Sequence, residues 1–248
     1  MGELIKPFVF LDYFDFSASD APGFGWHPHS GIATLTVLHE GRLEYQETTG
    51  VKGILSRGGI EWMRAGKGVW HTGNALGSGR TRGFQLWIAL PEHLETAPSQ
   101  SHYLSAADVP RRKAARIILG SHDDTNSVIA APDGINYLDV QLEPRERWTY
   151  QPPPGHEVAW LAVSQGVINT SERVETGELV VFEESNDAIS IQAERAARFV
   201  LGSARKHPHP LVLGYYSVHT TPGALGVGES EIRRIGDQLM ASGVLGGR

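Results

Sequence analysis

Three histidines in the first third of the chain have the residue type and spacing of metal ligands. His27 and His29 are separated by one proline, and two residues at that spacing point to the same side of an extended chain. His71 follows a glycine-containing turn at residues 66–68 and begins another apolar segment. Imidazole nitrogen is a common ligand of Zn, Cu, Fe and Ni. We therefore predict that His27, His29 and His71 form one metal-binding pocket.

A second pair with the same spacing, His207 and His209, is not expected to bind metal. It lies between Lys206 and Pro210, follows an apolar segment instead of opening one, and has no further histidine after a glycine turn at the required distance. We interpret this pair as part of a surface loop.

The composition excludes several other kinds of chemistry. The chain of 248 residues contains no cysteine, which excludes disulfides, zinc–thiolate sites and cysteine nucleophiles. It contains neither a Gly-x-Ser-x-Gly nucleophile elbow nor a phosphate-binding Gly-x-x-x-x-Gly-Lys-Ser/Thr loop, so hydrolase and nucleotide-binding functions are not favoured. The formal net charge of −6 argues against direct nucleic-acid binding, which depends on clustered Lys and Arg.

The elements that must position the histidines are predicted to be short β-strands. Apolar and polar residues alternate in segments such as 32–41, 42–50, 53–63 and 83–91, and the 29 glycines supply turns between them. This pattern predicts an all-β protein. A helix is expected only near residues 229–241, where Ile232, Ile235, Leu239 and Met240 fall close to helical spacing.

The same rhythm of strands occurs twice along the chain. A charged, proline-containing segment at about residues 92–113 interrupts it and is interpreted as a connector. We therefore expect an N-terminal barrel with the metal site, connector included, over residues 1–113. A second barrel without metal is expected over residues 114–248, with an apolar interior that includes Leu138, Val140, Trp160 and Val181 and with the helix at its end.

Four stretches, in this order, resemble the pirin family of the cupin superfamily: FLDYFDF, GFGWHPHSGIATLTVLHEG, GGIEWMRAGKGVWHTGN and GFQLWIALP. The glycine at position 41, twelve residues after His29, also fits the cupin pattern. The resemblance covers nearly the whole chain and is most specific over residues 7–91. It implies a bicupin fold, that is, two antiparallel β-barrels of jelly-roll type with a short C-terminal helix, and an iron site in the N-terminal barrel only.

Carried over to this sequence, the resemblance assigns three metal ligands and shows two departures. The ligands are His27, His29 and His71. The fourth ligand of the family is a glutamate two residues after the third histidine, where this chain has Gly73, and another family glutamate is replaced by Ala33. Because neutral imidazoles cancel none of the charge of a divalent ion, we expect weaker metal binding. Fe²⁺ is the expected metal, with Zn, Ni, Cu or Mn as alternatives and an empty site as a further one.

Other residues near the histidines in sequence are candidates for the remaining roles. Glu61 lies in the strand before His71 and is the candidate catalytic base, provided that its side chain points inward. Asn74, Gln85, Phe24 and Trp26 are candidates for lining the cavity.

Resemblance to the bacterial, quercetinase-like branch of pirins implies an oxidoreductase, a quercetin 2,3-dioxygenase-like enzyme whose partners are a flavonol-type aromatic molecule and dioxygen. The alternative is a metal-free or redox-sensing regulatory protein that binds without turnover and contacts a protein partner, as the eukaryotic branch suggests. We expect a cytoplasmic protein without membrane contact, because Met1–Phe16 lacks the pattern of a secretory signal and no apolar run reaches 18 residues.

Overall fold

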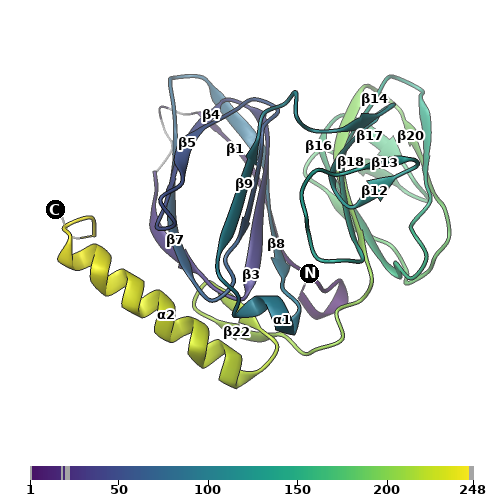
Figure 1. The fold of residues 1–248 in the computed structure, drawn as a ribbon. Coiled ribbons are helices and arrows are strands. Elements are labelled where there is room, and N and C mark those ends of the chain that lie inside the picture. The colour runs from purple at the N-terminus through teal and green to yellow at the C-terminus, as the bar shows by residue number, and fades with distance from the viewer. Residues whose placement is uncertain (1, 18, 20–22, 246–248) are drawn as a thin grey trace. The chain divides into compact units, whose positions relative to one another are not determined.

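The computed structural model describes residues 2–17, 19 and 23–245, and these residues form two compact units. The first unit consists of Met1–Glu3, Pro7–Ala106 and Pro208–Arg248. The second consists of Leu4–Lys6 and Ala107–His207. Both are built from antiparallel strands, which confirms the all-β prediction (Figure 1).

The first unit contains two sheets that face each other. One has the strand order β1-β8-β3-β6-β9, formed by Phe8–Ser17, Arg80–Ala89, Ile32–Glu40, Ile60–Arg64 and Gln100–Leu104. The other has the order β2-β7-β4-β5, formed by Phe24–His29, Val69–Ala75, Arg42–Glu47 and Lys52–Ser56. A 3-10 helix, η1, spans Gly2–Leu4, and a short helix, α1, spans Glu92–Glu95.

The five-stranded sheet carries a row of polar side chains across its inner face. Cross-strand pairing places Asp12 opposite Gln85, Gln85 opposite Thr36, Thr36 opposite Glu61 and Glu61 opposite Tyr103. Residues paired in this way point to the same face of a sheet. The neighbouring positions on each strand point to the other face. Pairing register therefore decides which residues face the interior of the unit.

The C-terminal segment packs with the first unit, so the expected second domain of residues 114–248 is wrong at its C-terminal end. A hairpin of β22 (Val212–Gly214) and β23 (Ser217–His219) leads into α2 (Pro222–Ala241). Trp70 on β7 donates from Nε1 to the carbonyl oxygen of Ile232 at 2.7 Å, and the Ile232 side chain is buried. These contacts hold the helix against the strand that carries His71.

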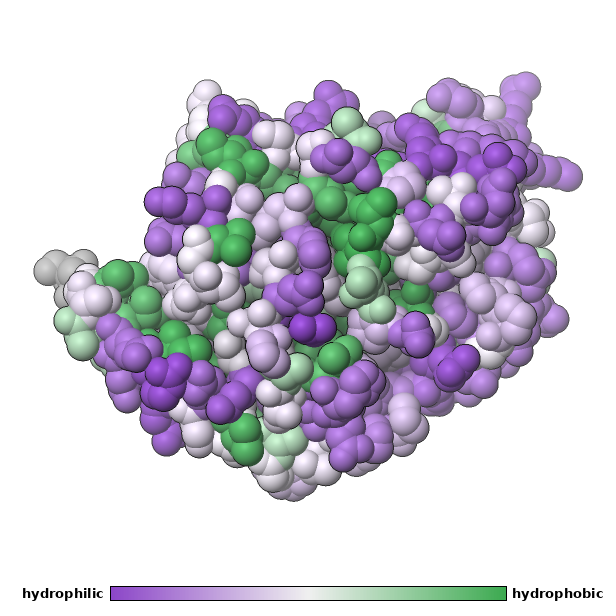
Figure 2. All heavy atoms as spheres, viewed as in Figure 1, coloured by the Kyte–Doolittle hydropathy of each residue, from purple (hydrophilic) through white to green (hydrophobic). Residues whose placement is uncertain are grey.

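Helix α2 begins seven residues before the expected start at residue 229. Thr221 accepts a hydrogen bond from the backbone N–H of Ala224, and Pro222 occupies the first helical position, which together form a strong helix start. The following turns contain Gly223, Gly226 and Gly228, which weaken the helical signal in the sequence. Figure 2 shows hydrophilic residues along α2 with hydrophobic ones among them, and Val227 and Met240 are exposed. Within the described residues, no helix combines the length and the apolar character that crossing a membrane requires.

The expected connector at residues 92–113 is only partly a connector. Strand β9 pairs with β6 and completes the five-stranded sheet of the first unit. Strand β10 (Arg111–Arg112) pairs with β11 (Ala115–Leu119) in the second unit. The division between the units falls at residues 106 and 107.

The second unit also contains two main sheets. One has the order β10-β11-β14-β21-β16-β19, in which the last four strands are Ile135–Leu142, Ala197–Ala204, Val158–Gln165 and Leu179–Val181. The other has the order β15-β20-β17-β18, formed by Arg147–Tyr150, Ile189–Ala193, Val167–Asn169 and Arg173–Glu175. A small hairpin joins β12 (Ser121–His122) and β13 (Thr125–Asn126).

The interior of the second unit is apolar and includes two of the four residues expected there. Leu138 and Val140 belong to its main hydrophobic cluster. Leu161 also belongs to that cluster, so its neighbour Trp160 points to the opposite face of the strand, as does Val181, with which Trp160 pairs. Trp160 is completely buried, as expected, but on the face of the sheet that points away from this cluster, so Trp160 and Val181 do not fill the interior predicted for them.

Candidate metal centre

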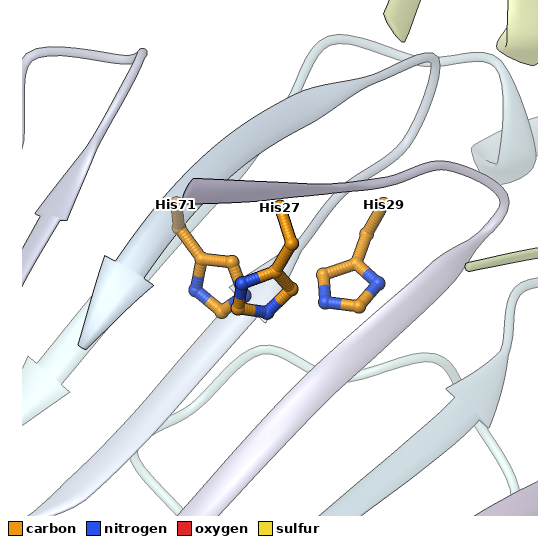
Figure 3. Close-up of side chains that lie close together, drawn as sticks. All are labelled: His27, His29 and His71. Atoms are coloured by element: carbon orange, nitrogen blue, oxygen red, sulfur yellow. The ribbon is translucent and has the colours of Figure 1, made fainter. Parts of the chain in front are cut away.

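The structure brings His27, His29 and His71 together. Pairing of β2 with β7 places His27 directly opposite His71, and His29 lies two residues further along the same face of β2. One ring nitrogen from each residue lies within 4.8 Å of the other two. Figure 3 shows the three rings converging on a common space. The side chains of His29 and His71 are buried, and His27 is half-buried.

Backbone carbonyl groups fix the orientation of two of these rings. The Nδ1 atom of His27 lies 2.8 Å from the carbonyl oxygen of Gly25, and Nδ1 of His29 lies 3.0 Å from that of Tyr216. Because a carbonyl oxygen only accepts, each Nδ1 must carry the proton, which leaves the lone pair on Nε2. Metal-binding histidines typically donate from their second nitrogen to such a partner.

Two buried nitrogen atoms of the cluster have no hydrogen-bond partner within the described residues, namely Nε2 of His29 and Nε2 of His71. Leaving a buried polar atom unsatisfied costs on the order of 1–3 kcal/mol. A metal ion among the three rings would satisfy both atoms. The donor set therefore fits a divalent transition metal such as Zn, Cu, Fe or Ni.

The electrostatic environment keeps the three imidazoles neutral. Burial lowers the pKa of His29 to about 3, helped by the nearby His27. Burial also lowers the pKa of His71 well below its ordinary value and lowers the pKa of His27. Neutral imidazole is the form that binds metal, so at neutral pH the site requires no loss of protons from its ligands.

Glu61 points into the unit, beside the histidines. Its Oε1 lies 3.7 Å from Nδ1 of His71, and its Oε2 accepts a 2.5 Å hydrogen bond from Thr36 Oγ1. The 3.7 Å separation is too long for a hydrogen bond. Burial raises the pKa of Glu61 to about 7. A buried carboxylate therefore stands next to the third histidine, although it occupies a different strand from the glutamate of the family pattern.

The two sites that lack the family's glutamates differ in orientation. Gly73 faces the cavity, and a Cβ atom added there would have the carbonyl oxygen of Glu44, at 3.9 Å, as its nearest neighbour. Ala33 lies three positions before the inward-facing Thr36, an odd number, so it points to the other face of β3. A carboxylate at position 33 would not reach the histidines. Only the loss at Gly73 changes the site.

His27 and His71 open onto a cavity in which a water-sized sphere can occupy about 80 Å³; the empty space is about 670 Å³ when open solvent at the mouth is included. Its wall is formed by Asp12, Phe14, Phe16, Phe24, His27, Thr36, Leu43, Glu44, Tyr45, Leu55, Glu61, His71, Thr72, Gly73, Gln85 and Tyr103. Gln85 and Phe24 are among these residues, as the sequence suggested. Asn74 and Trp26 are not among them. Asn74 follows the inward-facing Gly73 and Trp26 precedes the inward-facing His27, so each points to the outer face of its strand.

Among the described residues, the charged side chains that face the cavity are the carboxylates of Asp12 and Glu61. Glu44 pairs with Asn74 and lies between the inward-facing Leu43 and Tyr45, so its carboxylate points to the outer face of β4. Neither Lys nor Arg is among the lining residues. Burial raises the pKa of Asp12, as it does that of Glu61. The cavity thus combines aromatic walls with acidic and neutral polar groups.

Comparison with known proteins agrees with this architecture. The protein-family model described as Pirin matches residues 1–88. A pirin-like protein of Caulobacter vibrioides is 33% identical over 220 residues, which cover 85% of this chain and 79% of the relative. A protein of Pseudomonas aeruginosa named "Putative quercetin 2,3-dioxygenase" is 31% identical over 226 residues, with coverage of 85% and 79%.

Solved structures show the same fold. A quercetin 2,3-dioxygenase from Acinetobacter baumannii superimposes with a TM-score of 0.86 at 24% identity, covering 94% of this chain and 86% of the other. The bacterial pirin YhhW from Escherichia coli, solved with nickel(II), has a TM-score of 0.69 at 22% identity, covering 83% and 85%. The fold is therefore a bicupin, and the chain belongs to the pirin family.

Proposed function

We propose that the protein is a metal-dependent dioxygenase that acts on a neutral, planar phenol of the flavonol type, with one Fe²⁺ ion bound by His27, His29 and His71. The observation that carries this proposal is the pair of buried, unsatisfied Nε2 atoms of His29 and His71 beside an aromatic cavity. The name of the Pseudomonas aeruginosa relative supports the reaction class. The nickel(II) complex of YhhW supports a divalent metal.

When bound, Fe²⁺ would polarise an oxygen of the substrate and provide open positions for a second ligand such as dioxygen. The remaining steps depend on side chains of this protein. Phe14, Phe16 and Phe24 present ring faces that suit a flat aromatic substrate. Phe16 and Phe24 come from different sheets, and their ring centroids are 6.3 Å apart. They would hold the substrate ring with its hydroxyl group directed toward the histidines.

Glu61 is the group best placed to remove the proton of that hydroxyl. In metal-free protein burial raises its pKa to about 7, and a cation bound beside it would favour the ionised form, which is the form that accepts a proton. The hydrogen bond from Thr36 holds one carboxylate oxygen, and the other faces His71. The proton would move from the substrate oxygen to Oε1 of Glu61.

The charge of the cavity favours neutral substrates. An aromatic carboxylic acid would bring its negative charge close to Asp12 and Glu61, and none of the described residues that line the cavity is a Lys or Arg that could compensate it. Like charges in a partly dry cavity repel strongly. A phenol or flavonol avoids this cost and can donate hydrogen bonds to the carboxylates. We therefore expect flavonols to bind better than otherwise similar molecules that carry a carboxylate.

A second candidate function is binding of an aromatic molecule without turnover. Gly73 favours it, because the family's fourth ligand is absent there and Glu61 approaches His71 from another strand. The two functions share a ligand and differ in whether dioxygen is consumed.

The test is an anaerobic titration of metal-free protein, purified without an affinity tag, with Fe²⁺, followed by addition of quercetin and then dioxygen. Dioxygen uptake together with loss of the flavonol absorbance band supports the enzyme. Spectral evidence of flavonol binding without dioxygen uptake supports the second function. His71→Ala should abolish metal binding. Glu61→Gln should slow turnover, with Glu44→Gln, on the outer face of β4, as the matched control for loss of a carboxylate.

A further inference from the structure

A second group of buried polar side chains lies on the far side of His29 from the cavity. His219 connects Glu95 with Ser30, through distances of 3.2 Å from Nδ1 to Glu95 Oε2 and 3.0 Å from Nε2 to Ser30 Oγ. Ser30 donates to Ser217 Oγ at 2.9 Å, and Ser217 donates to the carbonyl oxygen of Tyr215 at 2.9 Å. The side chains of His219, Glu95, Ser30 and Ser217 are almost completely buried. They come from β23, α1 and the residues that flank β2 and β3.

The acid, histidine and serine have the order of a hydrolytic triad, but the geometry excludes that role. Ser30 has no exposed surface. The backbone of α2 covers it, since a Cβ atom on Gly228 would lie 2.4 Å from Ser30 Oγ and 2.5 Å from Nε2 of His219. A substrate carbonyl has no room to approach the hydroxyl. The group must act on its neighbours in the protein.

The neighbour that it holds is the turn at Tyr216. Ser30 forms an isolated bridge with Ser217, and the backbone N–H of Val218 donates to the carbonyl oxygen of Ser30 at 3.3 Å. Tyr216 has a φ of 52°, an uncommon value for a residue with a side chain, so the turn needs such support. The carbonyl oxygen of Tyr216 is the atom that accepts from Nδ1 of His29.

The far end of the group is also held firmly. Glu95 accepts from the backbone N–H of Thr220 at 2.7 Å through Oε2 and from the Thr220 hydroxyl at 2.7 Å through Oε1. Both carboxylate oxygens are thus bonded to the residues that follow β23. The connection from Glu95 to the Tyr216 turn is therefore continuous and buried.

We propose that Glu95, His219, Ser30 and Ser217 are positioning residues of the metal centre, which fix the Tyr216 carbonyl so that His29 presents Nε2 to the metal. The proposal rests on the metal centre of the proposed function and adds a part to it, namely the C-terminal hairpin. Loss of partners that orient a metal-binding histidine typically weakens metal affinity 10- to 100-fold. Because these four residues act through the Tyr216 carbonyl, the lower end of that range applies to each single substitution.

The experiment uses the full chain with two nearly isosteric variants at opposite ends of the group, Ser217→Ala and Glu95→Gln. Thr221→Ala is the matched control, because it removes the N-cap hydrogen bond of α2 in the same C-terminal segment without touching the group. Co²⁺ affinity is measured by titration well below the melting temperature of each variant. We expect about tenfold weaker binding for each test variant, less than a hundredfold for the double variant because the residues act as one unit, and wild-type affinity for Thr221→Ala.

A second measurement addresses the orientation of His29 directly. Nitrogen-15 NMR of metal-free protein should show His29 protonated at Nδ1 in the wild type and in Thr221→Ala, and a mixture of tautomers in Ser217→Ala. Wild-type Co²⁺ affinity in both folded test variants would overturn the proposal, as would protonation of His29 at Nε2 in the wild type. If the variants do not fold, the proposal is tested by the wild-type spectrum, which shows which ring nitrogen of His29 carries the proton. If the wild type binds no metal, the proposed function fails, whereas the tautomer still tests the inference.

Discussion

Restoring a carboxylate at position 73 should convert the three-histidine site into a stronger one. Gly73 faces the cavity two residues after His71, so a glutamate there lies on the same side of β7. Its Cβ atom would have 3.9 Å to the nearest heavy atom, the carbonyl oxygen of Glu44. We therefore expect Gly73→Glu to fold and to place an anionic oxygen near the ion held by the histidines.

The magnitude follows from charge and burial. An anionic oxygen beside a divalent ion in a partly dry cavity should favour the bound state by about 1–3 kcal/mol after desolvation is subtracted. That corresponds to a roughly 5- to 150-fold gain in affinity, since about 1.4 kcal/mol is a factor of ten. Without metal the new charge faces the same cavity as the carboxyl group of Glu61, so the metal-free variant should be less stable than the metal-free wild type. Metal should therefore raise the melting temperature of Gly73→Glu more than that of the wild type.

The assay is anaerobic Fe²⁺ titration of the wild type, Gly73→Glu and Asn74→Glu. Asn74 is the next residue along β7 and points to the outer face, so Asn74→Glu adds the same charge at almost the same place in the chain without reaching the metal. Equal affinity in the wild type and Gly73→Glu would refute the reasoning, because it would mean that Glu61 or another group already completes the coordination. A similar gain in Asn74→Glu would show that net charge, and not a ligand, is responsible.

Three further outcomes can be measured. In metal-free protein Glu61 binds more protons in the folded state than in the unfolded state between pH 4.5 and about 7, so its contribution to stability is lost as pH rises through 7. Glu61→Gln should therefore raise the free energy of unfolding at pH 8 by up to about 3 kcal/mol and change it little at pH 4. Urea denaturation at the two pH values measures both. His27→Ala should reduce Co²⁺ affinity at least a hundredfold and leave the melting temperature of metal-free protein nearly unchanged, because His27 is only half-buried; calorimetry checks both. In the second unit, Asp139→Asn leaves the buried Arg116 and the half-buried Arg198 without their shared carboxylate and should cost about 3–5 kcal/mol in urea denaturation.

The period of a β-strand accounts for most of what the sequence could predict about the site. It places His27 and His29 on one face and, through the glycine turn, delivers His71 opposite them. Applied consistently, the same alternation also excludes Trp26 and Asn74 from the cavity, since each adjoins an inward-facing residue. The orientation of Glu61 is different, because it depends on the pairing of β6 with β3, which the local pattern does not reveal.

Contacts between distant parts of the chain could not be predicted. Tyr216 contributes a backbone carbonyl to His29 from 187 positions away, and a carbonyl group leaves no mark in the sequence. Asp12 and Tyr103 face the cavity only because of register across five strands. The assignment of the C-terminal segment to the first unit depends on the packing of Ile232 beside Trp70, and the apolar residues of α2 alone do not indicate which partner they cover.

The histidines have buried nitrogen atoms without a partner and Glu61 has a buried carboxyl group, and one cation would stabilise both. The neutral rings of His29 and His71 each have one lone pair, and within the described residues the buried Nε2 atom of neither ring has a hydrogen-bond partner. Both rings remain neutral because burial disfavours their charged forms. Glu61 is a buried carboxyl group whose ionised form is disfavoured for the same reason, and Thr36 compensates it only in part. A divalent ion among the rings would accept both lone pairs and stabilise the carboxylate 3.7 Å from His71. The unpartnered Nε2 atoms and the buried carboxyl group would each destabilise the folded protein. A metal centre explains why they occur together at one point.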